Sequence, residues 1–91
     1  MRTTAAKRDT NEPAIIQALK VIGATVQPLS SRGVPDLLVG YRGQNYLLEI
    51  KTAKNGLTDD QKPWHEWWFG QVAIVHTIEE AYRAIGAEVS Q

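Results

Sequence analysis

Two short apolar runs broken by a polar turn constrain this 91-residue chain more than any other feature. The runs are 37–39 and 46–48, and the turn contains Arg, Gly, Gln and Asn. Such a pattern predicts two antiparallel strands joined as a β-hairpin. A hairpin brings the start of its first strand to the end of its second, so we expect Asp36 to lie beside Glu49. Lys51 shares the face of Glu49, because side chains alternate along a strand.

The grouping of two carboxylates and an amine predicts a metal site, because a divalent cation would offset the repulsion between the carboxylates. Hard cations such as Mg²⁺ take oxygen ligands and keep several waters, so Asp36 and Glu49 suffice as side-chain ligands. The main-chain carbonyl of Ile50 could add a third oxygen. Lys51 could orient or deprotonate an attacking water, or stabilise developing negative charge. The alternative is a surface hairpin with an ordinary Glu–Lys pair.

The same residues resemble a known signature. The segments Gly33-Val-Pro-Asp36 and Glu49-Ile-Lys51 resemble the motif of the PD-(D/E)XK nuclease superfamily. With the short hairpin, they resemble more narrowly the virus-type replication-repair nuclease (VRR-NUC) domain, in the stand-alone form of phages and bacteria, which is similar to Holliday junction resolvases. This resemblance implies cleavage of DNA with Mg²⁺ or Mn²⁺. It also implies an α/β fold, a restriction-endonuclease-like αβββαβα core with a mixed central sheet flanked by helices.

The resemblance implies a role for each charged residue of the hairpin. The metal-binding aspartate of the family corresponds to Asp36 and its second carboxylate to Glu49, with the Ile50 carbonyl as a further ligand. The catalytic lysine corresponds to Lys51. The sequence departs from no core position of the motif, which argues against an inactive copy.

Two residues on expected helices are further candidates by the same resemblance. Glu12 corresponds to a glutamate of the first helix and would bind a second ion or its water. It lies just before Pro13, where a carboxylate also favours the start of a helix. Gln61 corresponds to a glutamine early in the helix after the lysine strand, but Thr58-Asp-Asp-Gln61 is also a capping box.

The charge of the chain is balanced, with ten basic and ten acidic residues, whereas dedicated DNA-binding domains are usually basic. The distribution of charge is more informative than the sum, because basic side chains cluster around the motif and could meet phosphates. The candidate DNA-binding residues are Ser30, Ser31, Arg32, Arg42, Lys54 and Lys62. For any single one of them, an ordinary solvated side chain or a turn is the alternative.

Trp64, Trp67 and Trp68 lie at helical spacing. A stripe of this kind is usually core, and we expect at least Trp64 and Trp68 there. Three tryptophans exceed what a core of this size needs, so we expect a homodimer interface to use the surplus. Stacking on an unpaired base is the rival use. A twofold dimer would supply two active sites for two symmetric nicks.

The remaining pattern predicts one domain over 1–91, with a flexible arm at 1–9 and a tail at 87–91. Expected helices cover 14–22, 58–69 and 77–85, and two strands at 24–28 and 72–75 accompany the hairpin. The chain lacks cysteine, which excludes disulfides and thiolate zinc sites. No apolar stretch approaches about 18 residues and no signal-peptide pattern is present, so we expect an intracellular protein without a membrane segment. The resemblance implies the cytoplasm of a bacterium or of a phage-infected cell.

The sequence therefore predicts a metal-dependent, structure-selective DNA endonuclease that acts as a homodimer on branched DNA such as Holliday junctions. A flap nuclease or a restriction-like nuclease is the alternative within the enzyme class. A non-catalytic DNA-binding or assembly module that keeps the fold is the alternative outside it. The sequence does not identify a helicase or replication protein as a partner.

Overall fold

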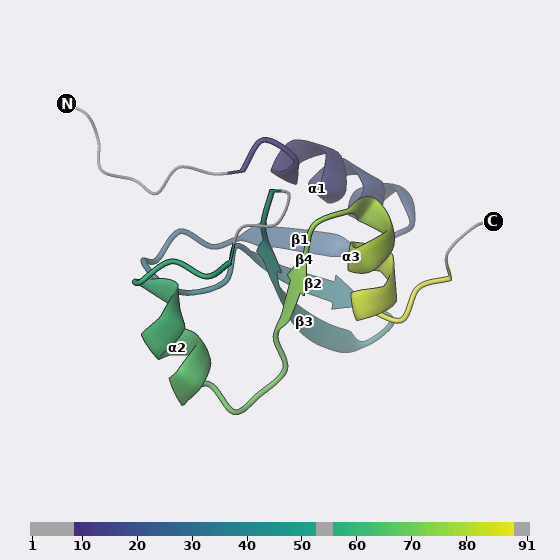
Figure 1. The fold of residues 1–91 in the computed structure, drawn as a ribbon. Coiled ribbons are helices and arrows are strands. Elements are labelled where there is room, and N and C mark those ends of the chain that lie inside the picture. Colours follow the sequence, from purple (N-terminus) through teal and green to yellow (C-terminus); the bar gives the residue numbers. More distant parts are fainter. Residues whose placement is uncertain (1–8, 53–55, 89–91) are drawn as a thin grey trace.

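The fold is a mixed α/β arrangement, seen in a computed structural model that describes residues 9–52 and 56–88 (Figure 1). The described elements follow the expected order αβββαβα. They are α1 (Glu12–Val21), β1 (Thr25–Pro28), β2 (Leu37–Tyr41), β3 (Gln44–Ile50), α2 (Gln61–Trp67), β4 (Ala73–Val75) and α3 (Ile78–Ala84). None of these helices is long and apolar enough to cross a bilayer.

The sheet has the strand order β1-β2-β3-β4. Strand β2 pairs antiparallel with both β1 and β3, and β4 runs parallel to β3. A parallel neighbour requires a crossover, which here is the segment that contains α2. Helices α1 and α3 contact each other and cover the same face of the sheet, whereas α2 stands apart from them (Figure 1). The expected mixed sheet with helices is confirmed, with the two packed helices on one face.

The predicted hairpin forms with a tighter turn than expected. Tyr41 pairs with Gln44, so the loop consists of Arg42 and Gly43 alone. Both loop residues have positive φ, 52° and 80°, as a two-residue type I′ turn requires. The strands are therefore longer than the apolar runs, and Arg42 occupies the far tip of the hairpin.

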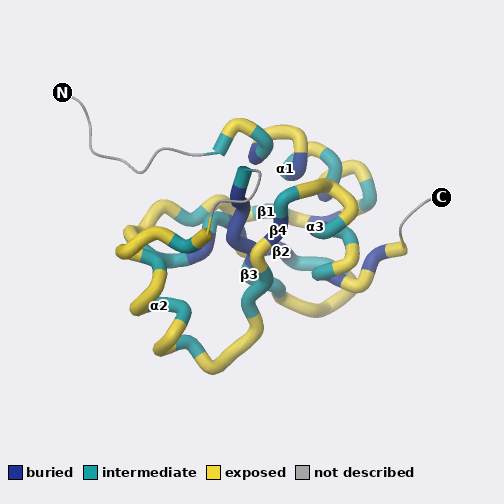
Figure 2. The backbone as a smooth tube through the Cα atoms, in the orientation of Figure 1, coloured by how far each residue is buried: buried dark blue, intermediate teal, exposed yellow. Residues whose placement is uncertain are grey.

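The hydrophobic core lies between the sheet and the two packed helices (Figure 2). Its buried residues are Ile15, Leu19, Ala24, Leu37, Val39, Leu48, Ile50, Val75, Ala81, Ile85 and Ala87. Leu48 and Ile50 point into this core, so the alternation of β3 directs Glu49 and Lys51 to the opposite face. Ala87 falls within the predicted tail but is buried, and its N–H donates to the carbonyl of Tyr82 at 2.9 Å.

The second helix is shorter than predicted at both ends. It begins at Gln61, with Asp60 as N-cap, instead of at Thr58, and it ends at Trp67 instead of Phe69. The early end has a physical cause in Trp68, whose backbone is extended and whose indole Nε1 donates to the carbonyl of Gln71 at 2.9 Å. Helix α3 is capped by Thr77, whose hydroxyl accepts the N–H of Glu80 at 3.0 Å.

The turn generates a prediction about stability. Replacing Arg42 by Asn should raise the free energy of unfolding by up to about 1 kcal/mol, because Asn tolerates the left-handed conformation better than Arg. Urea denaturation measures this change. Arg42→Ala is the control, since it also removes the guanidinium that lies 5.1 Å from the Tyr41 ring but gains no left-handed preference. A loss of stability in Arg42→Asn as large as that in Arg42→Ala would contradict the assignment of a type I′ turn with Arg42 in the left-handed conformation.

Candidate active site

The hairpin places the two carboxylates of the motif side by side. Leu37 pairs with Leu48, so the next residues outward, Asp36 and Glu49, face each other. Asp36 Oδ2 accepts the N–H of Ile50 at 2.7 Å. Because the N–H and C=O of one strand residue point to the same edge, the Ile50 carbonyl is directed to the side where Asp36 lies.

Glu49 is a buried carboxylate, with 1% of its surface exposed. Its Oε1 is also buried and receives no hydrogen bond from the described residues. Burial, the negative charge of Asp36 and a hydrogen bond shared with Asp36 together raise the pKa of Glu49 to about 7, and burial is the largest of these causes. Lys51 and a hydrogen bond from Gln61 act in the opposite direction. The site therefore holds a negative charge that its own protein groups satisfy only in part.

Gln61 joins the lysine to the glutamate. Its Oε1 accepts a hydrogen bond from Lys51 Nζ at 2.6 Å, and its Nε2 donates to Glu49 Oε2 at 2.6 Å. Lys51 Nζ lies 3.7 Å from the same glutamate oxygen, and 6% of Lys51 is exposed. Gln61 Oε1 also accepts the N–H of Thr58 at 2.9 Å. The Gln61 side chain thus both caps the start of α2 and contacts the lysine and the glutamate of the site.

The start of α2 is held against the loop between β1 and β2. That loop is closed at its base by a hydrogen bond from the Leu29 N–H to the Asp36 carbonyl, 2.8 Å long. Gly33 has φ of 84°, and a Cβ there would lie 2.8 Å from the Asp60 carbonyl oxygen. Only glycine fits both the conformation and the close approach. The glycine of the motif thereby lets α2 approach closely enough for Gln61 to reach Lys51.

Asn11 reaches the same region from the start of α1. It is the N-cap residue, but its side chain makes no capping hydrogen bond. Its Nδ2 instead donates to the carbonyls of Lys51 at 3.1 Å and His76 at 2.8 Å, and its Oδ1 accepts from Thr52 Oγ1 at 3.3 Å. Nothing local in the sequence distinguishes an asparagine that caps a helix from one that bonds distant backbone groups in this way.

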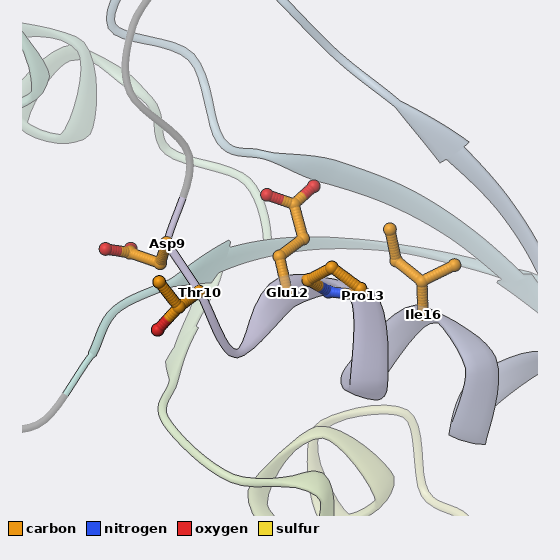
Figure 3. A pocket seen from close by; sticks show the side chains of 5 residues that line it. All are labelled: Asp9, Thr10, Glu12, Pro13 and Ile16. Atoms are coloured by element: carbon orange, nitrogen blue, oxygen red, sulfur yellow. The ribbon is translucent and has the colours of Figure 1, made fainter.

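Glu12 is buried at the start of α1 and lines a cavity of about 570 Å³ with Asp9, Thr10, Pro13 and Ile16 (Figure 3). Its side chain leaves the helix on the same side as that of Ile16 (Figure 3). The structure does not bring Glu12 into a shared cluster with Asp36 and Glu49, since the described residues contain no group of three or more His, Cys, Asp or Glu placed to hold one ion. The observed core of the site is thus two carboxylates, a lysine and a glutamine.

His65 lies on the same side of α2 as Gln61, one helical turn further along. Burial lowers its pKa, and the charge of Lys51 lowers it further, so the imidazole is neutral near pH 7. Its ring meets the Trp64 ring edge-on, with centroids 5.2 Å apart. His65 is therefore packed against Trp64.

The candidate DNA-binding residues fall into three places. Arg32 and Lys62 lie beside the start of α2, in exposed ion pairs of 3.0 Å with Asp60 and 3.7 Å with Asp59. Exposed pairs of this kind are weak, so both cations can be shared with phosphate. The exposed Ser30 and Ser31 share the loop with Arg32, next to Asp36. Arg42 is separated from the site by the length of the hairpin, and Lys54 lies outside the described residues.

The tryptophans divide into two groups. Trp64 and Trp68 do not belong to the hydrophobic core, so the expectation that placed them there is wrong. They are half-buried on α2, which stands apart from the core, and they stack on each other with ring centroids 5.0 Å apart and planes 17° from parallel. Trp67 is 70% exposed, and the adjacent Phe69 is 96% exposed. The surface aromatic group therefore consists of Trp67 and Phe69.

The donor set fits a hard divalent cation. Asp36 and Glu49 present carboxylate oxygens, the Ile50 carbonyl points to the same side, and Glu49 Oε1 is buried without a hydrogen-bond donor among the described residues. Mg²⁺ needs only one or two carboxylates because it retains waters, so three side-chain ligands are not required.

The raised pKa of Glu49 predicts how stability depends on pH. The carboxyl ionises near its ordinary value of 4.5 in the unfolded chain and near 7 in the folded one. Between these values the folded state binds more protons, so the stability of the metal-free protein should fall as pH rises from about 4.5 through 7. Glu49→Gln should lose this fall, whereas Glu66→Gln, an exposed glutamate of α2, should keep it. Thermal unfolding in EDTA measures the effect, and identical pH profiles for wild type and Glu49→Gln would contradict it.

Comparisons with known proteins extend this picture. No family model matches the sequence, and no curated protein matches it significantly. A solved structure described as a VRR_NUC domain matches with a TM-score of 0.66 and 25% identity, over 85% of this chain and 96% of that chain. This match confirms the resemblance carried by the hairpin motif and the expected mixed α/β fold. The chain is therefore similar to a VRR-NUC domain in fold and in its hairpin motif, and that fold is of the nuclease type.

Proposed function

We propose that this chain is a metal-dependent DNA endonuclease that hydrolyses phosphodiesters in branched DNA. The observation that carries the proposal is the buried Glu49 carboxylate, which faces Asp36 and shares Gln61 with Lys51. A chain that only bound DNA would have no use for two adjacent carboxylates at its surface of contact, because they repel phosphate. The similarity to a VRR_NUC domain supports the same conclusion.

The proposed metal ligands are Asp36, Glu49 and the Ile50 carbonyl, with Glu12 as a ligand of a second ion or of its water. The expected ion is Mg²⁺ or Mn²⁺. A cation bound there would neutralise the two carboxylates and polarise the phosphoryl group for attack. Glu12 is buried, with its carboxylate on the sheet side of α1 (Figure 3). This position supports its proposed role as a ligand of a second ion or of the water of that ion.

Lys51 is the proposed catalytic lysine. Its Nζ is held by Gln61 Oε1 at 2.6 Å, which fixes one of its three N–H groups and leaves the others for water or a phosphate oxygen. In that place it would orient the attacking water or stabilise the negative charge of the pentavalent transition state. Gln61 also orients Glu49, so we infer that Gln61 keeps both groups in their reactive geometry. By resemblance to the family, the products carry 5′-phosphate and 3′-hydroxyl ends.

The proposed DNA-binding surface surrounds this site. Ser30, Ser31 and Arg32 extend from the loop that Asp36 closes, and Lys62 follows Gln61 on α2. Arg42 would contact a more distant phosphate, since the hairpin separates it from the carboxylates. Lys54 completes the predicted DNA-binding set but lies outside the described residues.

The proposed assembly is a homodimer, because two sites are needed to cut two strands of a four-way junction symmetrically. Trp67 and Phe69 supply the exposed aromatic surface that such an interface favours. The rings of Trp64 and Trp68 adjoin Trp67, with centroids 6.5 Å and 6.1 Å from its own, and would extend this surface.

Cleavage of defined DNA substrates tests the proposed reaction. A labelled four-way junction should receive paired nicks with Mg²⁺ or Mn²⁺ and none in EDTA, and it should be cut faster than matched duplex, flap or single-stranded DNA. Asp36→Asn and Lys51→Ala should lower kcat by about 100-fold or more, because each removes a group acting on the transition state. Equal cutting of all substrates would reject junction selectivity. Binding without cutting in every metal would favour the non-catalytic module.

Gln61→Ala in the same assay tests whether Gln61 orients Lys51 and Glu49, and a second variant controls for the mere loss of an amide side chain. The variant should lose about 10–100-fold in kcat, the range typical of residues that orient a reactive group. Gln17→Ala removes a similar amide from the exposed face of α1 and should leave kcat unchanged.

Dimerisation has its own prediction. Trp67→Ser together with Phe69→Ser should shift the protein from dimer to monomer in sedimentation velocity experiments, because aromatic anchors carry much of the binding energy of an interface. Val21→Ser removes an equally exposed apolar side chain at the end of α1 and should leave the dimer intact. A wild-type protein that is monomeric across the micromolar range would contradict the dimer. Loss of DNA binding without loss of dimer would favour base stacking.

A further inference from the structure

Asn11 commits its whole side chain to tertiary contacts. Asparagine at an N-cap normally accepts an N–H of its own first helical turn. Here the Nδ2 group donates to two carbonyls, of Lys51 and His76, and Oδ1 accepts from Thr52. The carboxamide thus uses both donors and its acceptor across sequence separations of 40, 65 and 41 residues.

These contacts fix the start of α1 relative to the ends of β3 and β4 at the site. The two carbonyls lie at the ends of β3 and β4, and β3 ends directly before Lys51. Glu12 follows Asn11 in the chain, so their Cα atoms are about 3.8 Å apart. Figure 1 shows the start of α1 above the end of β3. The amide therefore holds the first residue of α1 at a set place beside the lysine of the site.

A second restraint on the same backbone supports this view. The N–H of Lys51 donates to the carbonyl of Val75 at 3.0 Å, on the same edge of β3 that carries the carbonyl bound by Asn11. Both backbone polar groups of Lys51 are thereby used, and the lysine backbone has little freedom to shift. The N–H of Ile50, on the other edge, donates to Asp36.

We propose that Asn11 is a positioning residue of the active site, which holds the start of α1, and with it Glu12, next to the site of Asp36, Glu49 and Lys51 by bonding the backbone at the ends of β3 and β4. The inference rests on the proposed nuclease function. Asn11 itself touches neither substrate nor metal and acts through Glu12. Thr52 orients the carboxamide and contributes to a smaller degree.

The competing explanation is that Asn11 stabilises the fold as a whole, and Tyr82 offers a control for it. The Tyr82 hydroxyl donates to the Ala18 carbonyl at 3.2 Å and so ties α3 to α1. Tyr82→Phe removes one side-chain hydrogen bond that holds α1, six residues along the helix from Glu12. Asn11→Ala removes three such bonds, all at the start of α1. The two variants separate a general loss of stability from a loss of position.

The experiment measures kcat and KM of junction cleavage for wild type, Asn11→Ala, Thr52→Val and Tyr82→Phe, and repeats Asn11→Ala in a Glu12→Gln background. Asn11→Ala should lower kcat by about 10–100-fold with little change in KM, and Thr52→Val should have a smaller effect in the same direction. Tyr82→Phe should leave kcat unchanged. In the Glu12→Gln background, Asn11→Ala should cause little further loss, because the two residues act as one unit.

Amide hydrogen exchange of the same proteins gives a readout that does not depend on activity. Asn11→Ala should accelerate exchange in the first turn of α1 while the core strands stay protected, which also shows that the variant is folded. The inference is overturned if Asn11→Ala matches Tyr82→Phe in kcat, or if its loss is undiminished in the Glu12→Gln background. A wild-type protein that cuts no substrate overturns the proposed function and this inference with it, whereas active wild type with unaffected Asn11→Ala overturns the inference alone.

Discussion

The two-residue turn at Arg42 and Gly43 sets the register in which β2 pairs with β3, and this register decides which side chains meet on each face. With Leu37 opposite Leu48, the apolar residues of both strands enter the core, and Asp36 comes to face Glu49 on the other side. A slip by one residue would expose the core leucines and bury the charges within it. Folding and the proposed chemistry thus depend on the same backbone pairing. A change of this register would disrupt both the core and the site.

The site is assembled around a charge that burial makes unfavourable. Glu49 is enclosed beside Asp36, and the protein offsets its charge only with Lys51 and one hydrogen bond from Gln61. Full compensation would leave no reason for a cation to bind, whereas no compensation would destabilise the strand. The partial compensation that is observed suits a site whose remaining charge is neutralised by a metal. Such arrangements are common where function rather than stability has shaped the environment of a titratable group.

Much of this could be predicted from the sequence, because the hairpin and its charged residues are local features. Alternating apolar residues, a glycine turn and fixed spacing suffice to bring Asp36, Glu49 and Lys51 together. The C-terminal end of α2 could not be predicted, since it depends on the indole of Trp68 bonding Gln71 after folding. The contacts of Asn11 were also hidden, because an asparagine before a helix has the same sequence pattern whether it caps that helix or bonds residues 40 or 65 positions away. The separation of Arg42 from the site became visible only with the full length of the strands.

The measurement that tests the central claim most directly is a ¹³C NMR titration of the Glu49 side-chain carboxyl, with and without Mg²⁺. Without the ion, we predict a pKa of about 7, set mainly by burial and by Asp36. With saturating Mg²⁺, the pKa should fall well below that value, because the cation favours the ionised form. A carboxyl that titrates near 4.5 in the metal-free protein, or one whose titration is unchanged by Mg²⁺, would contradict the account of Glu49 as a buried metal ligand.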